Sequence, residues 1–159
     1  MSLEMVRIDD RFIHGQVVVG WCPDIEPDRL ILCDDEIASC DWESEIYQDA
    51  ATEYETSVCT IDGTARLLGD DKTKKERIFL IVSSPAVLVR LMERGVKIER
   101  VTVGGMHYHE GKRKIANYVF IDDTDLEHFR YLVRNNVTLE ARDVPTCKPV
   151  DLTQKLKLR

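Results

Sequence analysis

The chain lacks the features that mark membrane, secreted and repeat proteins. Of its 159 residues 43% are hydrophobic, but no apolar run approaches the roughly 20 residues that a membrane-spanning helix needs. The start of the chain has no basic segment followed by an apolar one, so we expect no secretory signal peptide. There is no internal repeat, low-complexity tract or linker, which predicts a single domain over residues 1–159. Residues 1–3 are a candidate cloning remnant ahead of Met5 and are left out of the fold prediction.

Cysteine is present, but not in a pattern that binds metal or forms a disulfide framework. The five cysteines are odd in number and include no Cys-x-x-Cys pair, which argues against zinc ribbons, thioredoxin-like redox sites and secreted disulfide scaffolds. Several lie in apolar runs, where a free thiol behaves as a small buried hydrophobic side chain. We therefore expect a cytoplasmic protein. With a formal net charge of −7, the chain also lacks the basic excess that generic nucleic-acid binding requires.

Short β-branched runs alternate with longer amphipathic segments along the whole chain. Strands are expected at residues 4–8, 29–33, 56–61, 77–82, 99–103, 118–121 and 137–144. Helices are expected from residue 15 to a stop at Pro23, and at residues 41–51, 63–68, 84–92, 123–135 and 151–158, with Asp41 as an N-cap. This alternation predicts an α/β protein with an open, mostly parallel twisted sheet and helices on both faces.

The loop after the first strand is the strongest candidate site, because ligands of such sheets bind beyond the carboxyl ends of the strands. Residues 9–16 read Asp-Asp-Arg-Phe-Ile-His-Gly-Gln. This set suits phosphoryl transfer to an imidazole: a neutral ring nitrogen of His14 is nucleophilic near pH 7, and a carboxylate such as Asp10 can fix its tautomer. Arg11 can meet the charge of the phosphoryl group with its planar fork of donors.

Further groups near this loop are candidate phosphate ligands. Backbone N–H groups of Gly15, Gln16 and Val17 are expected to be free at the start of a helix, where anions bind. Ser83 and Ser84 end another strand, where a hydroxyl could touch the phosphate, although the pair Ser84-Pro85 is favoured as no more than a helix start. A structural interpretation of the whole loop also stays open, with the histidine as a packing or capping residue and the aspartates in a turn.

Residues 7–17, Arg-Ile-Asp-Asp-Arg-Phe-Ile-His-Gly-Gln-Val, closely resemble the active-site signature of a known family. This family is the IIB component of the mannose/fructose/sorbose family of the bacterial phosphoenolpyruvate-dependent sugar phosphotransferase system. Three further stretches resemble it in the expected order: residues 34–36, residues 103–106 with 110–112, and residues 144–146 with 150–152. The resemblance therefore spans nearly the whole chain.

The resemblance implies a phosphotransferase that acts as a phosphocarrier. His14 would take a phosphoryl group through Nδ1 from a phosphohistidine on a IIA protein or domain, and would pass it to a sugar carried by the membrane components IIC and IID. Arg11 would stabilise the group in transfer. No metal or other cofactor is implied. The family fold adds an antiparallel edge to the mostly parallel sheet, and the protein would be cytoplasmic, peripheral to the inner face of the membrane when docked.

Some residues depart from the family pattern. Phe12 stands where leucine is common and should be tolerated if it points to the core. Residues 107–109, His-Tyr-His, replace a segment that usually differs, and Cys147 and Pro149 vary a C-terminal motif. These departures leave open the sugar, and also whether a sugar is the final acceptor: a stand-alone regulatory phosphorelay protein of the same family is the alternative.

Two other clusters are open to more than one interpretation. His107 and His109 could contact a partner or the phosphate, or lie in a solvated loop, and their spacing does not select a metal. Lys112, Arg113 and Lys114 form a basic run that could dock an acidic partner surface or be a solvated turn.

A receiver module that is phosphorylated on aspartate with Mg²⁺ is an alternative from another class of protein. Asp9 and Asp10 resemble the acidic pair of such a module, and Asp62 could serve as its acceptor. However, residues 103–105 supply no lysine after the fifth strand, and a receiver gives Arg11 and His14 no role. We therefore disfavour this alternative.

Overall fold

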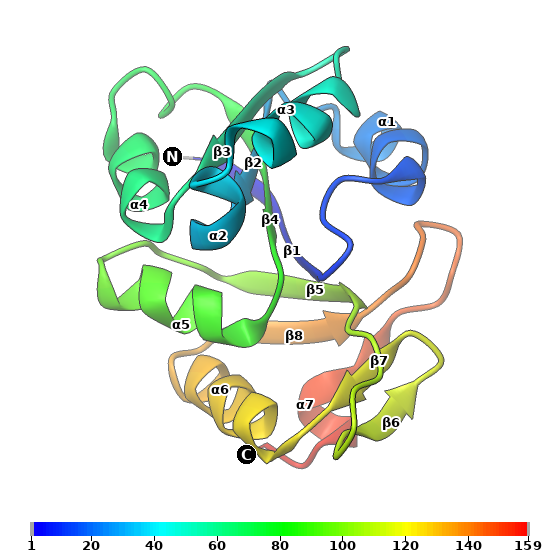
Figure 1. Cartoon of the computed structure of the whole chain (residues 1–159). Coiled ribbons are helices and arrows are strands. Elements are labelled where there is room, and N and C mark those ends of the chain that lie inside the picture. The colour runs from blue at the N-terminus through cyan, green and yellow to red at the C-terminus, as the bar shows by residue number, and fades with distance from the viewer. Residues whose placement is uncertain (1, 159) are drawn as a thin grey trace.

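A seven-stranded sheet forms the centre of this computed structural model, which describes residues 2–158. Its strands are β1 (Ser2–Asp9), β2 (Arg29–Cys33), β3 (Glu55–Cys59), β4 (Arg77–Val82), β5 (Arg100–Gly105), β8 (Thr138–Ala141) and β9 (Val150–Asp151). They lie in the order β3-β2-β4-β1-β5-β8-β9 (Figure 1). All neighbours are parallel except β8 and β9. The predicted mostly parallel sheet with an antiparallel edge is confirmed.

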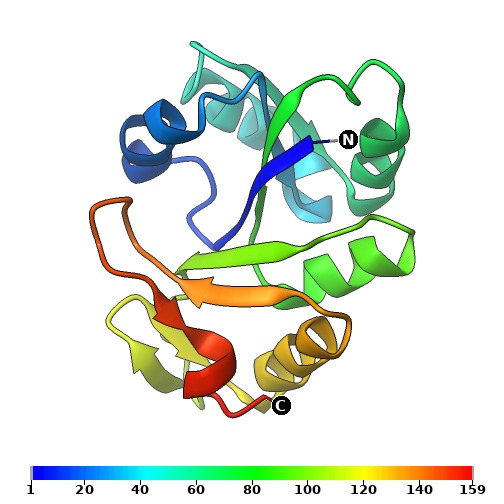
Figure 2. The same ribbon diagram turned by 180° about the vertical axis from the view of Figure 1, so that it is seen from behind.

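Helices cover both faces of the sheet, as predicted. They are η1 (Gln16–Trp21, a π-helix), α1 (Cys22–Ile25), α2 (Asp35–Ala38), α3 (Asp41–Asp49), α4 (Ile61–Gly69), α5 (Pro85–Glu93), α6 (Asp123–Arg134) and α7 (Leu152–Lys155). One core packs α4, α5 and α6 against the sheet, and the other packs η1, α1 and α3 against the opposite face (Figures 1 and 2). No helix of residues 2–158 combines the length and apolarity needed to cross a bilayer.

The position of β1 brings two distant loops together. β1 lies between β4 and β5, with Ile8 opposite both Val82 and Val103. The strands of this parallel group end at one edge of the sheet, so the loop after β1 lies beside the loop after β5. A hydrogen bond of 3.0 Å from the Asp10 N–H to the Gly105 carbonyl joins them.

A small hairpin outside the main sheet was not predicted. It pairs β6 (Arg113–Ala116) with β7 (Val119–Ile121) in antiparallel orientation, and Met106 forms an isolated bridge to Val119. The strand expected at residues 118–121 therefore exists, but it belongs to this hairpin. The short, polar β6 carries no alternating apolar pattern, which is why the sequence did not reveal it.

Several predicted boundaries are wrong. The strand expected at residues 56–61 ends at Cys59, because α4 already begins at Ile61. The strand expected at residues 137–144 covers only Thr138–Ala141, and the helix expected at residues 151–158 covers only Leu152–Lys155.

Pro23 does not stop the first helix, which runs on to Ile25, because the proline lies in the first turn of α1, where a missing N–H is tolerated. Asp41 is the first residue of α3 and not its cap, since Cys40 occupies that position without a side-chain bond. β1 begins before residue 4, because Ser2 and Leu3 already pair with β4.

Candidate active site

The loop after β1 is anchored by two buried apolar side chains. Phe12 and Ile13 are 8% and 4% exposed and belong to the core under η1 and α3. Phe12 has a positive φ of 59°, donates its N–H to the Asp9 carbonyl at 3.0 Å, and meets the Tyr47 ring edge-on at 5.5 Å between centroids. The expectation that Phe12 points into the core is confirmed. With both side chains fixed inside, the loop presents His14 at the edge of the sheet.

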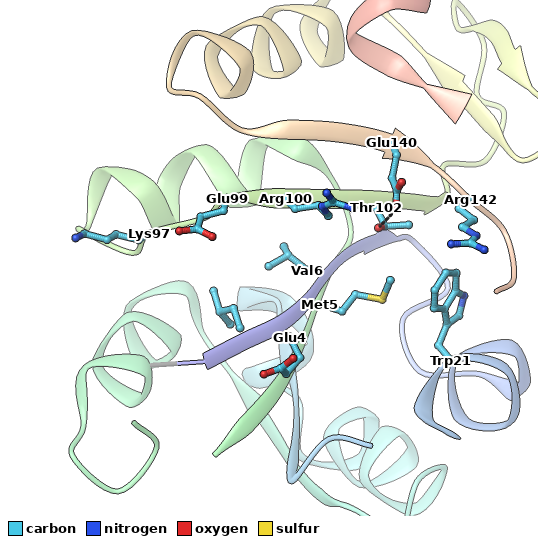
Figure 3. A pocket seen from close by; sticks show the side chains of 11 residues that line it. Glu4, Met5, Val6, Trp21, Lys97, Glu99, Arg100, Thr102, Glu140 and Arg142 are labelled. Carbon is cyan, nitrogen blue, oxygen red and sulfur yellow. Dashed lines mark hydrogen bonds between the residues drawn. The ribbon is translucent and has the colours of Figure 1, made fainter. Parts of the chain in front are cut away.

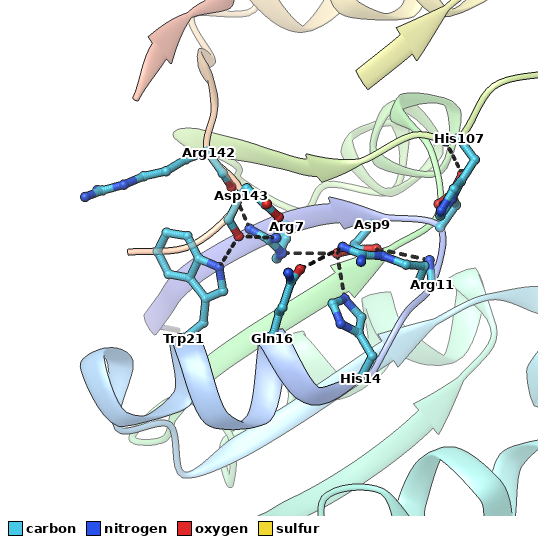
Figure 4. A network of polar contacts seen from close by, with 10 residues as sticks. Arg7, Asp9, Arg11, His14, Gln16, Trp21, His107, Arg142 and Asp143 are labelled. Atoms are coloured by element: carbon cyan, nitrogen blue, oxygen red, sulfur yellow. Dashed lines mark hydrogen bonds and ion pairs between the residues drawn. The ribbon is translucent and has the colours of Figure 1, made fainter. Parts of the chain in front are cut away.

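Asp9 is the centre of the polar contacts in this loop (Figure 4). Its carboxylate is fully buried. One oxygen lies 2.8 Å from Nε2 of His14, and the two oxygens accept from Nε and Nη2 of Arg11 at 3.1 and 3.2 Å. The Arg11 backbone N–H adds a fourth contact at 3.1 Å. Asp9 thus holds both side chains that the sequence singled out.

The charge of Asp9 is stabilised by these contacts. Burial alone would raise the pKa of Asp9, but the hydrogen bonds from His14 and Arg11 outweigh it and hold this pKa at about 2. The carboxylate is therefore ionised at neutral pH. An ionised carboxylate only accepts hydrogen bonds, so the neutral His14 ring must carry its proton on Nε2.

The second nitrogen of the His14 ring, Nδ1, is available to react. The side chain is 19% exposed, so the ring reaches the surface. Nδ1 has no hydrogen-bond partner among residues 2–158, and with the proton on Nε2 it carries the lone pair. A nucleophile held through its other nitrogen by a buried carboxylate is the arrangement that covalent catalysis by an imidazole requires.

The predicted contact between Asp10 and His14 is wrong. Asp10 instead accepts the backbone N–H of His107 at 2.7 Å and contacts Nδ1 of the same residue. Asp9 is the last residue of β1 and meets the returning His14, whereas Asp10 lies in the turn beyond the strand and faces the loop after β5. Asp10 thereby joins the loops after β1 and β5.

Arg7 is a site residue that the sequence analysis missed. It is fully buried and its Nε lies 3.4 Å from Asp9. Its other nitrogens donate to the carbonyls of Arg142 and Asp143 at 3.0 and 2.8 Å, and its guanidinium lies 5.1 Å from the centre of the Trp21 ring. Burial lowers the pKa of Arg7, against the opposing effect of Asp9 and Asp143. The i, i+2 spacing of Arg7 and Asp9 on one strand was the available signal.

The two glycines at the end of β5 make room for these charges. A Cβ on Gly104 would lie 1.9 Å from Cζ of Arg7, and one on Gly105 would lie 2.8 Å from Oδ1 of Asp9. Any larger residue would have to displace the buried Arg7 and Asp9 side chains. The glycine pair in the family-like stretch 103–106 thus has a steric role.

The candidate phosphate ligands have different surroundings. The Val17 N–H is not free as expected, because it donates to the His14 carbonyl at 3.0 Å. Gln16 accepts from Nη2 of Arg11 at 3.2 Å through its side chain. Gly15 caps η1, and no atom lies within 4 Å of the position of a Cβ there. Ser83 follows β4, next to β1. Phosphate binding by Gly15, Gln16 and Ser83 stays a prediction.

The remaining candidates lie further from His14. Lys112 pairs with Asp125 at 3.1 Å and Arg113 with Asp123 at 3.2 Å, while Lys114 is exposed, so docking by this run stays a prediction. Within residues 2–158 no group of three or more His, Cys, Asp or Glu side chains is placed to hold a metal ion.

Two aspartates and two cysteines outside the loop after β1 have structural roles. Asp34 caps α2 by accepting the Ile37 N–H at 2.9 Å, and Asp35 accepts the Ile61 N–H at 2.8 Å. Burial raises the pKa of Cys22 and of Cys33 to about 12, so these thiols stay protonated, as expected of small buried side chains.

A cavity of about 750 Å³ lies beside η1, along β1, β5 and β8 (Figure 3). Trp21 and Arg142 line one end of it, and Thr102 and Glu140 lie along the strands. Trp21 also donates to the Asp143 carbonyl at 2.9 Å. His14 is not among the lining residues, so this cavity is separate from the imidazole site.

Comparisons with known proteins show the family of the chain. Residues 3–159 match the family model described as the PTS system sorbose subfamily IIB component, where PTS is the phosphotransferase system. The chain is 34% identical to the N-acetylgalactosamine-specific phosphotransferase enzyme IIB component 1 of Escherichia coli K12, over 91% of this chain and 92% of that protein. It is 35% identical to the mannose-specific EIIAB component of the same strain, over 98% of this chain and 50% of that protein, so it spans about half the length of this relative.

A solved structure shows the same fold. The IIBSor domain of the sorbose permease from Klebsiella pneumoniae superposes with a TM-score of 0.93 at 26% sequence identity, over 99% of this chain and 97% of that one. The family match covers nearly the whole chain and includes Asp9 and the side chains that contact it, those of Arg7, Arg11 and His14. The chain therefore belongs to the sorbose-subfamily IIB components of the bacterial sugar phosphotransferase system.

Proposed function

We propose that the protein is a phosphocarrier that receives a phosphoryl group on Nδ1 of His14. The donor is a phosphohistidine of a IIA protein or domain, and the acceptor is a sugar presented by the membrane components IIC and IID. The observation that carries this proposal is the pairing of Nε2 of His14 with the buried Asp9 carboxylate, at 2.8 Å, which leaves Nδ1 available on a ring that reaches the surface.

Each proposed role follows from a contact of this chain. As Nδ1 attacks, the phosphorus–nitrogen bond of the donor breaks, the new bond forms, and the ring becomes positively charged with its proton still on Nε2. The ionised Asp9 stabilises that charge. Arg11, whose side chain is 35% exposed, can meet the phosphoryl oxygens while Asp9 orients its guanidinium.

Transfer onward reverses these steps. A sugar hydroxyl oxygen attacks the phosphorus, the bond to Nδ1 breaks, and the ring recovers its lone pair as the hydroxyl proton is released. The N–H groups of Gly15 and Gln16 and the hydroxyl of Ser83 would bind phosphoryl oxygens, and the basic run at residues 112–114 would contact an acidic partner surface. In this role the protein would act in the cytoplasm, at the inner face of the membrane when it meets the permease.

The proposal is tested by following radiolabel from phosphoenolpyruvate through the two general phosphotransferase proteins and the cognate IIA protein. Label should enter this chain as an acid-labile, base-stable phosphohistidine, and His14→Ala should abolish it. His128→Ala, on α6, is the matched control and should be labelled as well as the unchanged protein. Label that persists in the His14→Ala variant would contradict the proposal and move the site elsewhere, with His107 and His109 the next residues to replace.

A further inference from the structure

Two consecutive aspartates at the end of β1 hold two histidines through opposite ring nitrogens. Asp9 binds Nε2 of His14 at 2.8 Å, and Asp10 contacts Nδ1 of His107. A carboxylate that accepts from a ring nitrogen keeps the proton on that nitrogen. The neutral ring of His14 is therefore protonated on Nε2, and the neutral ring of His107 on Nδ1.

His107 holds Asp10 through its main chain as well as its ring. Its backbone N–H donates to Oδ2 of Asp10 at 2.7 Å, and the ring contacts Oδ1. Asp10 in turn donates its own N–H to the Gly105 carbonyl at 3.0 Å. The His107 side chain is 60% exposed, so packing does not fix this ring. Its contact with Asp10 is what orients it.

The position of Asp10 gives this contact a consequence for the active site. Asp10 lies between Asp9, which holds His14, and Arg11, which faces the phosphoryl group in the proposed function. A shift of the backbone at Asp10 would move both neighbours. Figure 4 shows the His107 ring apart from the His14 ring, so its path to the active site within this chain is through Asp10 and not by contact with His14.

We propose that His107 is a positioning residue for phosphoryl transfer, acting by holding Asp10 and with it the backbone between Asp9 and Arg11. This inference rests on the proposed function of His14. It assigns a role to a residue in the segment where the chain departs from the family pattern. His107 touches none of the reacting atoms in this proposal, and its exposed Nε2 takes no part.

The first test uses the unchanged protein and needs no transfer reaction. Nitrogen-15 NMR of the histidine rings at about pH 8, above the usual titration range of histidine, distinguishes the two tautomers. We expect His107 to carry its proton on Nδ1 and His14 on Nε2. A His107 ring that carries its proton on Nε2 would show that Asp10 does not hold it, and would overturn the inference while leaving the proposed function of His14 untouched.

The second test measures single-turnover transfer from the phosphorylated IIA protein. His107→Ala should lower the maximal transfer rate by about 10- to 100-fold, the scale of a small misplacement of catalytic groups, with little change in the IIA concentration at half-maximal rate. His107→Asn carries an amide N–H close to the position of Nδ1–H and should stay within about threefold of the unchanged protein. His107→Gln places its amide further out and should behave as His107→Ala does.

The outcomes separate the possible roles of His107. An unchanged rate in His107→Ala, or an Asn variant as slow as the Ala variant, would overturn the positioning role. A change confined to the IIA concentration at half-maximal rate would also overturn it, because that result indicates a docking contact. Failure of the proposed function is recognised separately, by label that remains in His14→Ala.

Discussion

At the scale of single residues, the site depends on one buried carboxylate. Asp9 binds His14 and Arg11 and lies 3.4 Å from Nε of the fully buried Arg7. Removing Asp9 would leave the buried Arg7 without its carboxylate, and the loss of one partner of a buried ion pair costs about 3–5 kcal/mol. Asp9 therefore links the stability of the fold to the orientation of the His14 ring.

The low pKa of Asp9 predicts a loss of stability in acid. A carboxyl group with a pKa of about 2 in the fold, against 3.8 ordinarily, contributes roughly 2 kcal/mol that is fully present above about pH 4 and disappears as the pH falls toward 2. We expect Asp9→Asn to be less stable at neutral pH. The difference in unfolding free energy between the two proteins should shrink over this pH window, as measured by urea denaturation. A difference that stays constant down to pH 2 would contradict the low pKa of Asp9.

Arg11 should matter for transfer more than for folding. Its side chain is partly exposed, and the prediction is that Arg11→Ala slows transfer from the IIA protein by about 10²–10³-fold, since a charge that stabilises the transition state is lost. Arg11→Lys should recover only part of the rate, because an ammonium lacks the planar fork. Arg94→Ala, at the end of α5, is the control. Equal rates in Arg11→Ala and Arg94→Ala would exclude this role.

At the scale of elements, the end of β5 is shaped by the end of β1. Gly104 and Gly105 leave the space that Arg7 and Asp9 fill, and Asp10 and His107 then join the loops that follow. The buried side chains of Phe12 and Ile13 anchor the loop of residues 10–15 to the core. The geometry at His14 thus depends on packing between two strands and on the short loops after them.

Gly104→Ala tests this dependence. A Cβ there would lie 1.9 Å from Cζ of Arg7, so we expect a loss of about 1–3 kcal/mol or more in unfolding free energy, together with slower transfer. Gly69→Ala, at the end of α4 with no atom within 4 Å of its Cβ position, is the matched control and should be neutral or stabilising by up to about 1 kcal/mol. Equal stability of the two variants in thermal unfolding would disprove the steric role.

Elements with a clear pattern could be predicted from sequence, and contacts between them could not. The apolar run at residues 77–82 correctly predicted β4, and the segment between Pro85 and Gly95 correctly predicted α5. The polar β6 carries no such pattern. His14 and Arg11 could be singled out because both lie in one loop, and their role in phosphoryl transfer stays a prediction. Arg7 was missed because its partners are the carbonyls of residues 142 and 143, far away in the chain.

At the scale of the whole molecule, the sheet gathers segments from both ends of the chain around β1. The loop after β8 supplies the carbonyls that hold Arg7, and the loop after β1 supplies His14 (Figure 4). Gly105 at the end of β5 and His107 in the loop after it contact Asp10. The alternation of strands and helices along the sequence does not by itself give the order of the strands within the sheet. That order depends on which strands pair with one another. The IIB family model matches residues 3–159, so the match includes all of these segments.

The most direct measurement is the identification of the phosphorylated atom. Phosphorus-31 and nitrogen-15 NMR of the protein phosphorylated by its IIA partner distinguishes the two ring nitrogens of histidine. Because Asp9 occupies Nε2 of His14, the phosphoryl group should be bonded to Nδ1 of that residue. A phosphoryl group found on Nε2 of His14, or on any other side chain, would contradict the role assigned to the Asp9–His14 pair.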